Sequence, residues 1–455
     1  MDNEEYRKKL ASSEGWFRRA TRVLPDGLTH EVYYQTPYPP FVHRACGARK
    51  WDVDGNEYVD FWMGHGSLLL GHCHPEVVKA VRDQAERGTH YGACHPLEVE
   101  WAELITEMVP SAEMVRFTAS GTEAVMLALK LARAYTGKEK VIKLEGGFHG
   151  WSDYVQVGGG LTPPYDIPTS RGIPEGVRQS VLLSPPNDAE AVLDLLRRHE
   201  DVACILVEPG GGLASRLPSS KEYLNRLREM AIKYGVALVF DEVVTGFRYA
   251  PGGCQEYWGV VPDMTVLGKI VAGGMPGAGA VAGRRDIMAF LSRKGDVEWD
   301  RYRRVEHHGT FNASPITAAA GVATLRVIKK GDAIPQAHRT ADKLRQGING
   351  VFRQYGVACC AYGQASLVLP LLNHRCPLAS QCGRVACSQD YREINRFDPA
   401  VHAALREHML LQGIDLFPVA MFVSPAHSER DIELTVEAWD VAVRAMKKDG
   451  LLLES

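Results

Sequence analysis

Short apolar runs alternate with segments of helical apolar spacing through the middle of the chain, from about residue 75 to residue 270. The apolar runs are MVRFTA, KVIKLE, VACILVEP, VALVFDEV and MTVLGKI, and the helical segments include PEVVKAVRDQAERG, SGTEAVMLALKLARAYTG and KEYLNRLREMAIKYG. Strands that alternate with helices in this way typically form a mostly parallel sheet with helices on both faces. The pattern therefore predicts an α/β domain.

The two ends of the chain follow another pattern. Residues 3–23 predict an amphipathic helix that ends at Pro25-Asp26-Gly27, and FVHRACGARKWDVDGNEYVDFW predicts short strands that turn at Asp54-Gly55. A long helix is expected over 334–355. We predict a large domain over residues 61–325 and a smaller α+β domain formed by residues 1–60 and 326–455.

Composition and charge narrow the function. The 455 residues are 45% hydrophobic and 24% charged, as in an ordinary globular protein. With 52 Lys+Arg, 55 Asp+Glu and no basic tract, nucleic acid is not expected as a partner. No apolar run reaches the roughly 18 residues of a membrane helix, and the start lacks a secretory apolar segment. We expect a soluble, cytoplasmic enzyme with reduced cysteines.

Four elements could together hold one cofactor. Ser120-Gly121-Thr122 open a helix after a strand, where free amides and hydroxyls suit a phosphate. Phe148 and His149 follow another strand and offer a ring that can stack. Asp241 ends an apolar strand, and Lys269 ends the next. Each has an ordinary explanation as a helix cap, core residue or solvated loop. Taken together and in this order, they offer groups for the phosphate, the ring, the ring nitrogen and the aldehyde of pyridoxal 5'-phosphate (PLP).

The same stretches carry a family resemblance. They are WDVDGNEYVDF, LLLGHCHPEV, VRFTASGTEAVMLALKLARAYTG, IKLEGGFHGWSDY, LVFDEVVTGFR, TVLGKIVAGGMPGAGAVAG and HHGTFNASPITAAAGVATL. Over nearly its whole length the chain resembles the class III PLP-dependent aminotransferases of fold type I. The resemblance implies a large domain with a mostly parallel seven-stranded sheet and a smaller α+β domain.

The resemblance also implies roles for individual residues. Lys269 would form the internal aldimine with PLP, and Asp241 would pair with the pyridine nitrogen. Val243 and Phe148 would pack on opposite faces of the ring. The remaining cofactor contacts would be Ser120, Gly121, Thr122, His149, Glu208 and Thr310. Thr310 would reach the phosphate of a neighbouring subunit, which implies a homodimer.

Two groups of metal-ligating side chains are not expected to bind metal. His72-Cys73-His74 lies in a turn that the family uses without a metal. Cys376, Cys382 and Cys387, near His374, lack the paired spacing of zinc sites. We predict no metal site and leave the role of this cysteine region open.

Within the family, the chain looks similar to glutamate-1-semialdehyde 2,1-aminomutases but departs at three substrate-side points. Where the aminomutases have an arginine, this chain has Tyr33, with His30 three residues earlier. Where they have a tryptophan it has His65, and their glutamate falls at about Val419. Loss of the arginine matters most, because its planar fork binds carboxylates. We expect His30, Tyr33 and His65 to line the substrate pocket.

GHGSLLLGH and HPLEVEWAE look instead like the branch that contains D-phenylglycine aminotransferase. We therefore expect transfer of an amino group from an amino acid or amine donor to a keto-acid acceptor. An aminomutase or a class III racemase or epimerase remains an alternative, as do a nucleotide-binding enzyme and a non-catalytic homologue. The sequence leaves the donor, acceptor, stereochemistry and pathway open.

Overall fold

A seven-stranded sheet forms the centre of the region predicted as the large domain. The computed structural model describes residues 4–160, 163–211, 216–375, 391–417 and 419–455. The strand order is β4-β10-β9-β8-β7-β5-β6; β10 is antiparallel to β4 and β9, and the other neighbouring strands are parallel. The strands are β4 (Met114–Thr118), β5 (Lys140–Leu144), β6 (Val181–Ser184), β7 (Val202–Val207), β8 (Ala237–Asp241), β9 (Met264–Gly268) and β10 (Gly279–Gly283). The expected mostly parallel sheet is present.

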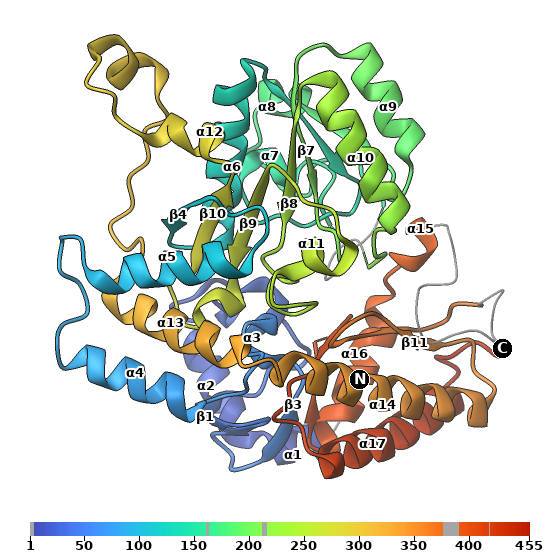
Figure 1. The fold of residues 1–455 in the computed structure, drawn as a ribbon. Helices are drawn as coiled ribbons and strands as arrows, with labels where there is room; N and C mark the ends of the chain where they lie inside the picture. Colours follow the sequence, from blue (N-terminus) through green and yellow to red (C-terminus); the bar gives the residue numbers. More distant parts are fainter. Residues whose placement is uncertain (1–3, 161–162, 212–215, 376–390, 418) are drawn as a thin grey trace.

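Alternate residues of the central strands pack on opposite faces of this sheet. Cys204, Leu206 and Val239 pack with α6 (Gly121–Thr136), whereas Ile205 and Leu238 pack with the other face. That second face is covered by α9 (Ala189–Arg198) and α10 (Lys221–Tyr234). Figure 1 shows these helices around the sheet, with α5 (Pro96–Met108) and α13 (Pro315–Lys329) near the β4 and β10 end. Burial on both faces explains the continuous apolar runs of the sequence.

Strand β10, like β6, is a part of the sheet that the apolar pattern did not predict. The β10 sequence, Gly-Ala-Val-Ala-Gly, lies within a glycine-rich stretch. Gly279 pairs with Thr118 on one side and Gly268 on the other, and a Cβ at Gly279 would collide with the Ser120 carbonyl. Small residues are required there because neighbouring backbone approaches closely.

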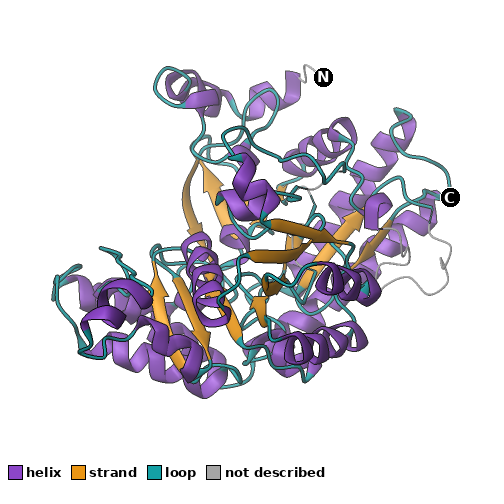
Figure 2. Cartoon of the chain, turned by 90° about the horizontal axis from the view of Figure 1, so that it is seen from above, coloured by secondary structure: helices purple, strands orange, loops and turns teal. Residues whose placement is uncertain are grey.

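The smaller unit joins the two ends of the chain. Its four-stranded sheet has the order β1-β2-β3-β13, in which β13 (Ile414–Asp415) is parallel to β3 (Glu57–Asp60). The other strands are β1 (Val42–Cys46), β2 (Arg49–Asp52) and, in a three-stranded sheet, β11 (Cys360–Tyr362), β12 (Leu367–Leu371) and β14 (Met421–Phe422). The main helices are α14 (Ala333–Tyr355), α16 (Pro399–Leu411) and α17 (Glu429–Lys448). Figure 2 shows helices packed around the strands when the chain is seen from above.

The expected N-terminal helix over 3–23 is two helices, α1 (Glu4–Lys9) and α2 (Ala11–Ala20). Leu10 between them is buried with Tyr6, Tyr58 and Leu410, and its backbone leaves the helical region. The second helix starts anew because the Ser12 and Ser13 amides donate to the Asp54 carboxylate, at 2.9 Å for Ser13. A carboxylate at a helix N-terminus satisfies amides that lack helical partners.

The remaining elements are short, apart from one helix of the large domain, α4, which packs against α13. They are α3 (Met63–Gly66), α4 (Pro75–Ala85), α7 (Asp153–Gln156), α8 (Glu175–Gln179), α11 (Gly253–Trp258), α12 (Arg285–Met288), α15 (Tyr391–Ile394), η1 (Pro25–Gly27), η2 (Glu31–Tyr33), η3 (Lys269–Ala272), η4 (Ala289–Leu291) and η5 (Trp299–Arg303).

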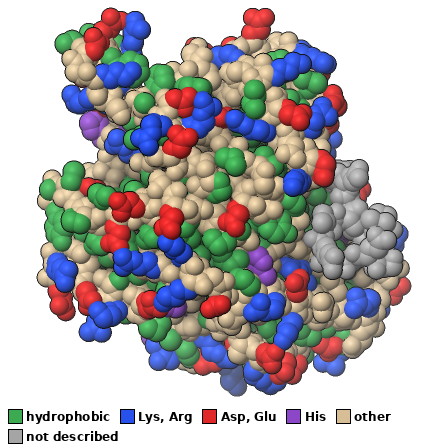
Figure 3. Space-filling model, viewed as in Figure 1, with side chains coloured by type: hydrophobic (Ala, Val, Ile, Leu, Met, Phe, Trp, Pro, Cys, Tyr) green, Lys and Arg blue, Asp and Glu red, His purple; other side chains and the backbone are tan. Residues whose placement is uncertain are grey.

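The surface mixes charges of both signs. On the face drawn in Figure 3, Lys and Arg side chains are interspersed with Asp and Glu. Within the described ranges, no helix has both the length and the apolar character to cross a bilayer.

Candidate active site

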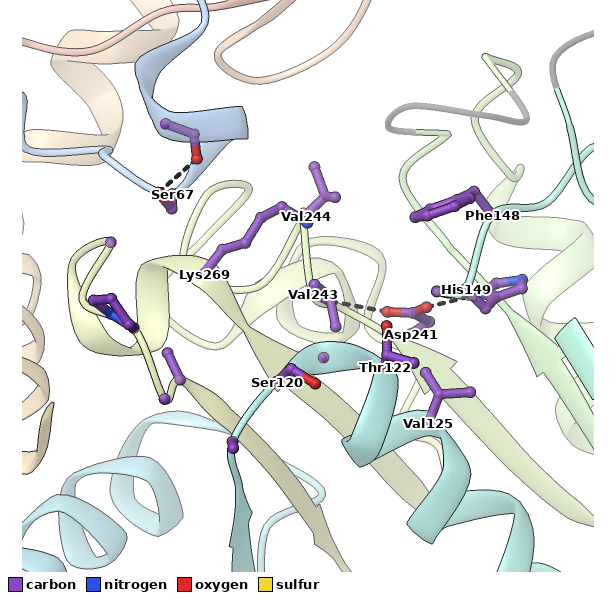
Figure 4. Close-up of a pocket in the computed structure, with 18 of the residues that line it drawn as sticks. Ser67, Ser120, Thr122, Val125, Phe148, His149, Asp241, Val243, Val244 and Lys269 are labelled. Carbon is purple, nitrogen blue, oxygen red and sulfur yellow. Dashed lines mark hydrogen bonds and ion pairs between the residues drawn. The ribbon is translucent and has the colours of Figure 1, made fainter. Parts of the chain in front are cut away.

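The carboxyl ends of the parallel strands meet at one edge of the large sheet and surround a cavity of about 330 Å³. Ligands of open α/β sheets bind at this edge. Figure 4 shows side chains from β8, the start of α6 and the β9–η3 junction facing the cavity. The expected cofactor residues that line it are Ser120, Gly121, Thr122, Phe148, His149, Glu208, Asp241, Val243 and Lys269.

Asp241, at the end of β8, is a buried carboxylate with two donors. His149 Nδ1 lies 2.7 Å from Asp241 Oδ2, and the Val243 amide donates to Oδ1 at 3.0 Å. Burial lowers the pKa of His149, so the ring favours its neutral form and donates through Nδ1. These two contacts fix the orientation of the carboxylate at the base of the cavity.

Lys269 follows β9 directly and its side chain reaches into the cavity (Figure 4). Its backbone has φ of 49°, a left-handed conformation that is uncommon for residues other than glycine. Burial lowers the pKa of the Lys269 amine below its usual range, while the charge of Asp241 opposes that shift. A lysine with a lowered pKa is a better nucleophile near neutral pH.

The N-terminus of α6 faces the same cavity. Ser120 caps the helix, since its side chain accepts from the Glu123 amide at 3.2 Å. The Gly121 and Thr122 amides precede the first helical hydrogen bond and are suited to an anion. A Cβ at Gly150, whose φ is 95°, would collide with Thr122 Oγ1. The glycine therefore allows the Phe148–Gly150 loop to approach the helix start.

The two residues expected to flank a cofactor ring lie at the cavity wall. Phe148 is 56% exposed and lines the cavity, so its ring is available to a ligand there. Val243 faces the cavity beside Asp241 (Figure 4), and Glu208 follows β7 and is buried.

Thr310 is the expected cofactor residue that this chain does not bring to its own cavity. It is exposed on the segment before α13 and does not line the cavity. The expected contact to a neighbouring subunit's phosphate thus remains a prediction.

A ring cluster lies at a second cavity of about 500 Å³, and Gly64 lines both cavities. Tyr33, Trp62 and His65 line the second cavity, whereas His30 lines neither and packs on the other rings. The His65 ring stacks on His30 at 5.0 Å and meets Tyr33 at 5.4 Å and Trp62 at 5.2 Å. The structure therefore brings the three expected substrate-pocket residues together. Trp62 was not expected, although it lies only two residues before the Gly64-His65-Gly66 stretch.

The ring cluster is uncharged near neutral pH. Burial lowers the pKa of His65 to about 4, helped by the repulsion between the protonated forms of His65 and His30 and by the Lys269 amine. Burial also lowers the pKa of His30. Burial raises the pKa of Tyr33. Val419 is buried in the apolar cluster that contains Trp62. This side of the site offers aromatic rings and apolar surface next to Lys269.

Metal ligation has no support in the part of the chain that the structure describes, where no three His, Cys, Asp or Glu side chains gather as a metal site. His72 Nε2 contacts the Asp60 carboxylate at 2.7 Å, and Cys73 is exposed. Cys376, Cys382 and Cys387 lie outside the described residues.

The architecture and the site together define a PLP-dependent enzyme of fold type I. The chain belongs to the class III aminotransferase family, whose model matches residues 33–358. Glutamate-1-semialdehyde 2,1-aminomutase of Desulforamulus reducens is 40% identical over 447 residues, 96% of this chain and 98% of the relative.

Solved structures agree with this family. An ω-transaminase from Sphaerobacter thermophilus has a TM-score of 0.87 at 34% identity, over 98% of this chain and 100% of that chain. A transaminase with PLP bound has a TM-score of 0.82 at 33% identity, over 97% and 99%. The expected family, fold class, enzymatic nature and PLP dependence are confirmed.

The residues of the cavity fit PLP. Gly121 and Gly150 leave space at the helix N-terminus that a Cβ would fill, and Phe148 presents an uncovered ring. Asp241 supplies a buried carboxylate and Lys269 a half-buried amine in the same cavity. The set contains one group for each part of the cofactor: phosphate, ring, ring nitrogen and aldehyde.

Proposed function

We propose that this chain is an aminotransferase that moves an amino group from an amino acid or amine donor to a keto-acid acceptor. The observation that carries the proposal is the uncharged ring wall of His30, Tyr33, Trp62 and His65 beside Lys269. Such a wall favours donors with a bulky or aromatic side chain, because rings stack and bury apolar surface.

The proposal assigns each cavity residue a task. Ser120, Gly121 and Thr122 hold the phosphate of PLP, and Phe148 and Val243 pack on the ring. Asp241 keeps the ring nitrogen protonated, and His149 holds Asp241 in place. Glu208 contributes a further buried group beside the cofactor.

Lys269 is the protein group that transfers the proton during the reaction. PLP, when bound, withdraws electrons from the carbon that bears the amino group, so a proton can leave that carbon. The Lys269 amine accepts this proton at Nζ and delivers it to the cofactor side. Its lowered pKa makes the neutral, proton-accepting form accessible near neutral pH.

The ring wall orients the donor. His65 and His30 are neutral, so they add no charge that would compete for the donor carboxylate. Thr310, exposed in this chain, completes the phosphate site of a neighbouring subunit in the proposed homodimer.

Glutamate-1-semialdehyde aminomutation is the second candidate. It is favoured by the relatives that share 36–40% identity over nearly the whole chain and carry that name. That reaction moves the amino group within one molecule and needs no keto-acid acceptor.

The cofactor's absorbance separates the candidates. A panel of amino donors, including aromatic ones, is added to the PLP enzyme, and a keto acid is added after the band of the bound cofactor has disappeared. We expect aromatic donors to bleach the band and the keto acid to restore it. A band that no donor bleaches would contradict transamination.

A further inference from the structure

Arg406, in α16, is a buried arginine that faces the second cavity. Its side chain lines that cavity with the residue only 6% exposed, and its guanidinium carbon lies 5.1 Å from the centre of the Trp62 ring. Nη1 donates to the Tyr34 carbonyl at 3.3 Å. Among the described residues, Nε has no hydrogen-bond partner. One edge of the guanidinium fork is thus unused.

The carboxylates beside Arg406 are committed to other partners. Asp415 accepts from Trp62 Nε1 at 2.8 Å and pairs with the Lys50 amine at 2.7 Å. Asp60 pairs with Lys50 at 3.1 Å and with His72 at 2.7 Å. Within the described ranges, Arg406 itself lies within ion-pair distance of no carboxylate.

A buried cation without an ion pair is costly unless something else compensates it. Asp415 does so only from a distance: burial lowers the pKa of Arg406 and the charge of Asp415 opposes the shift. A ligand carboxylate in the cavity could accept from the guanidinium, whose planar fork suits this partner.

The second cavity adjoins the cofactor cavity at the ring cluster. Gly64 lines both cavities, and His65 lies close enough to Lys269 and to Lys50 for both charges to lower its pKa. The rest of the second cavity is largely apolar, with Leu28 and Phe41 in its lining. A substrate could therefore extend from Lys269 past His65 toward Arg406.

We propose that Arg406 binds the carboxylate of the substrate, at a carbon separated from the one that carries the reacting amino group. This inference rests on the proposed function for the position of the reacting end. Arg406 on α16 would then supply the carboxylate-binding guanidinium that the aminomutases have at the position of Tyr33. The substrates are then carboxylates with an apolar or aromatic body.

Binding of an unreactive probe tests the inference without turnover. Calorimetry on the PLP enzyme compares 3-phenylpropanoate with its neutral amide. We expect wild type to bind the carboxylate about 10- to 100-fold more tightly. Arg406→Met removes this preference, and Arg406→Lys retains only part of it because the fork is lost. The amide binds all three proteins alike.

Arg44→Met is the matched control, since Arg44 also stacks on a tryptophan, Trp51 at 4.0 Å, but is exposed. It leaves the preference unchanged. Equal binding of carboxylate and amide by wild type overturns the inference whatever the variants do, as does equal weakening of both probes in Arg406→Lys. If Arg406 binds the probe but no donor bleaches the cofactor, the proposed function fails and this site stands.

Discussion

Replacing Gly121 by alanine should weaken PLP binding without unfolding the protein. A Cβ at Gly121 would lie 2.9 Å from both methyl carbons of Val243. Gly268 faces Val243 from another direction, since its own Cβ would lie 3.0 Å from Val243 Cγ1. Val243 also lines the cofactor cavity. The new methyl group therefore displaces the Val243 side chain into the space of the cofactor ring.

The size of the effect follows from these distances. Carbon atoms in contact lie about 3.5–4.0 Å apart, so the new methyl group is roughly 0.6–1.1 Å too close. Overpacking of this kind costs about 1–3 kcal/mol. If the cost falls on the PLP-bound state, the dissociation constant rises about 5- to 150-fold. Without PLP, Val243 has free space, and alanine in a helix gains about 0.5–1 kcal/mol over glycine.

Titration of the apoenzyme with PLP, followed by fluorescence, measures this effect alongside the thermal midpoint. Gly350→Ala, in the interior of α14 with open space around the new methyl group, is the control and keeps wild-type affinity. Gly121→Ala combined with Val243→Ala should bind PLP as well as Val243→Ala alone, since the collision is gone. Wild-type affinity in Gly121→Ala, or a double variant no better than it, would refute the reasoning.

Four further predictions follow from the site and its surroundings. Lys269→Ala abolishes turnover but still binds PLP non-covalently, and borohydride reduction with peptide mapping places the cofactor of the wild type on Lys269 and on no other lysine. Asp241→Asn, which removes the charge beside the ring nitrogen, lowers kcat by orders of magnitude, and near-normal kcat would remove Asp241 from the mechanism. Burial acts to raise the pKa of Asp60, but Lys50 and His72 outweigh it and hold the pKa well below its usual range. The stability that the Lys50–Asp60 pair contributes is therefore complete above about pH 4 and is lost as the pH falls through the folded-state pKa of Asp60. In denaturant titrations, Lys50→Met should cost about 3–5 kcal/mol of unfolding free energy at pH 7 and less at pH 3. Sedimentation shows a dimer at assay concentration and Thr310→Ala weakens PLP binding about tenfold, whereas a fully active monomer would contradict the shared site.

The sequence predicted the elements that are buried on both faces and missed those whose form depends on neighbours. VACILV and ALVFD are continuous apolar runs and are strands β7 and β8. Strand β10 was missed because its glycines and alanines are small for packing against adjacent backbone and have little apolar signal. The break at Leu10 depends on Asp54, more than forty residues away, and local spacing cannot reveal it.

The residues of the site likewise fall into those that the sequence predicted and those that only the fold reveals. The cofactor residues follow predicted strands, so the common edge of a parallel sheet was enough to bring them together. Arg406 is a single arginine on a largely buried helix, and its meeting with Trp62 depends on how α16 packs against β13, which pairs with β3. The Lys50, Asp60 and Asp415 cluster likewise comes from three strands that only the fold makes neighbours.

The fate of the donor's nitrogen tests the central claim most directly. The PLP enzyme is incubated with a ¹⁵N-labelled aromatic amino donor and an unlabelled keto acid, and in parallel with glutamate-1-semialdehyde alone, and the products are followed by mass spectrometry. Intermolecular transamination predicts ¹⁵N on the carbon skeleton of the keto acid, with little isomerisation in the parallel reaction. Efficient isomerisation of the semialdehyde without an acceptor, and no label on the keto-acid skeleton, would show the chain to be an aminomutase and contradict the proposal.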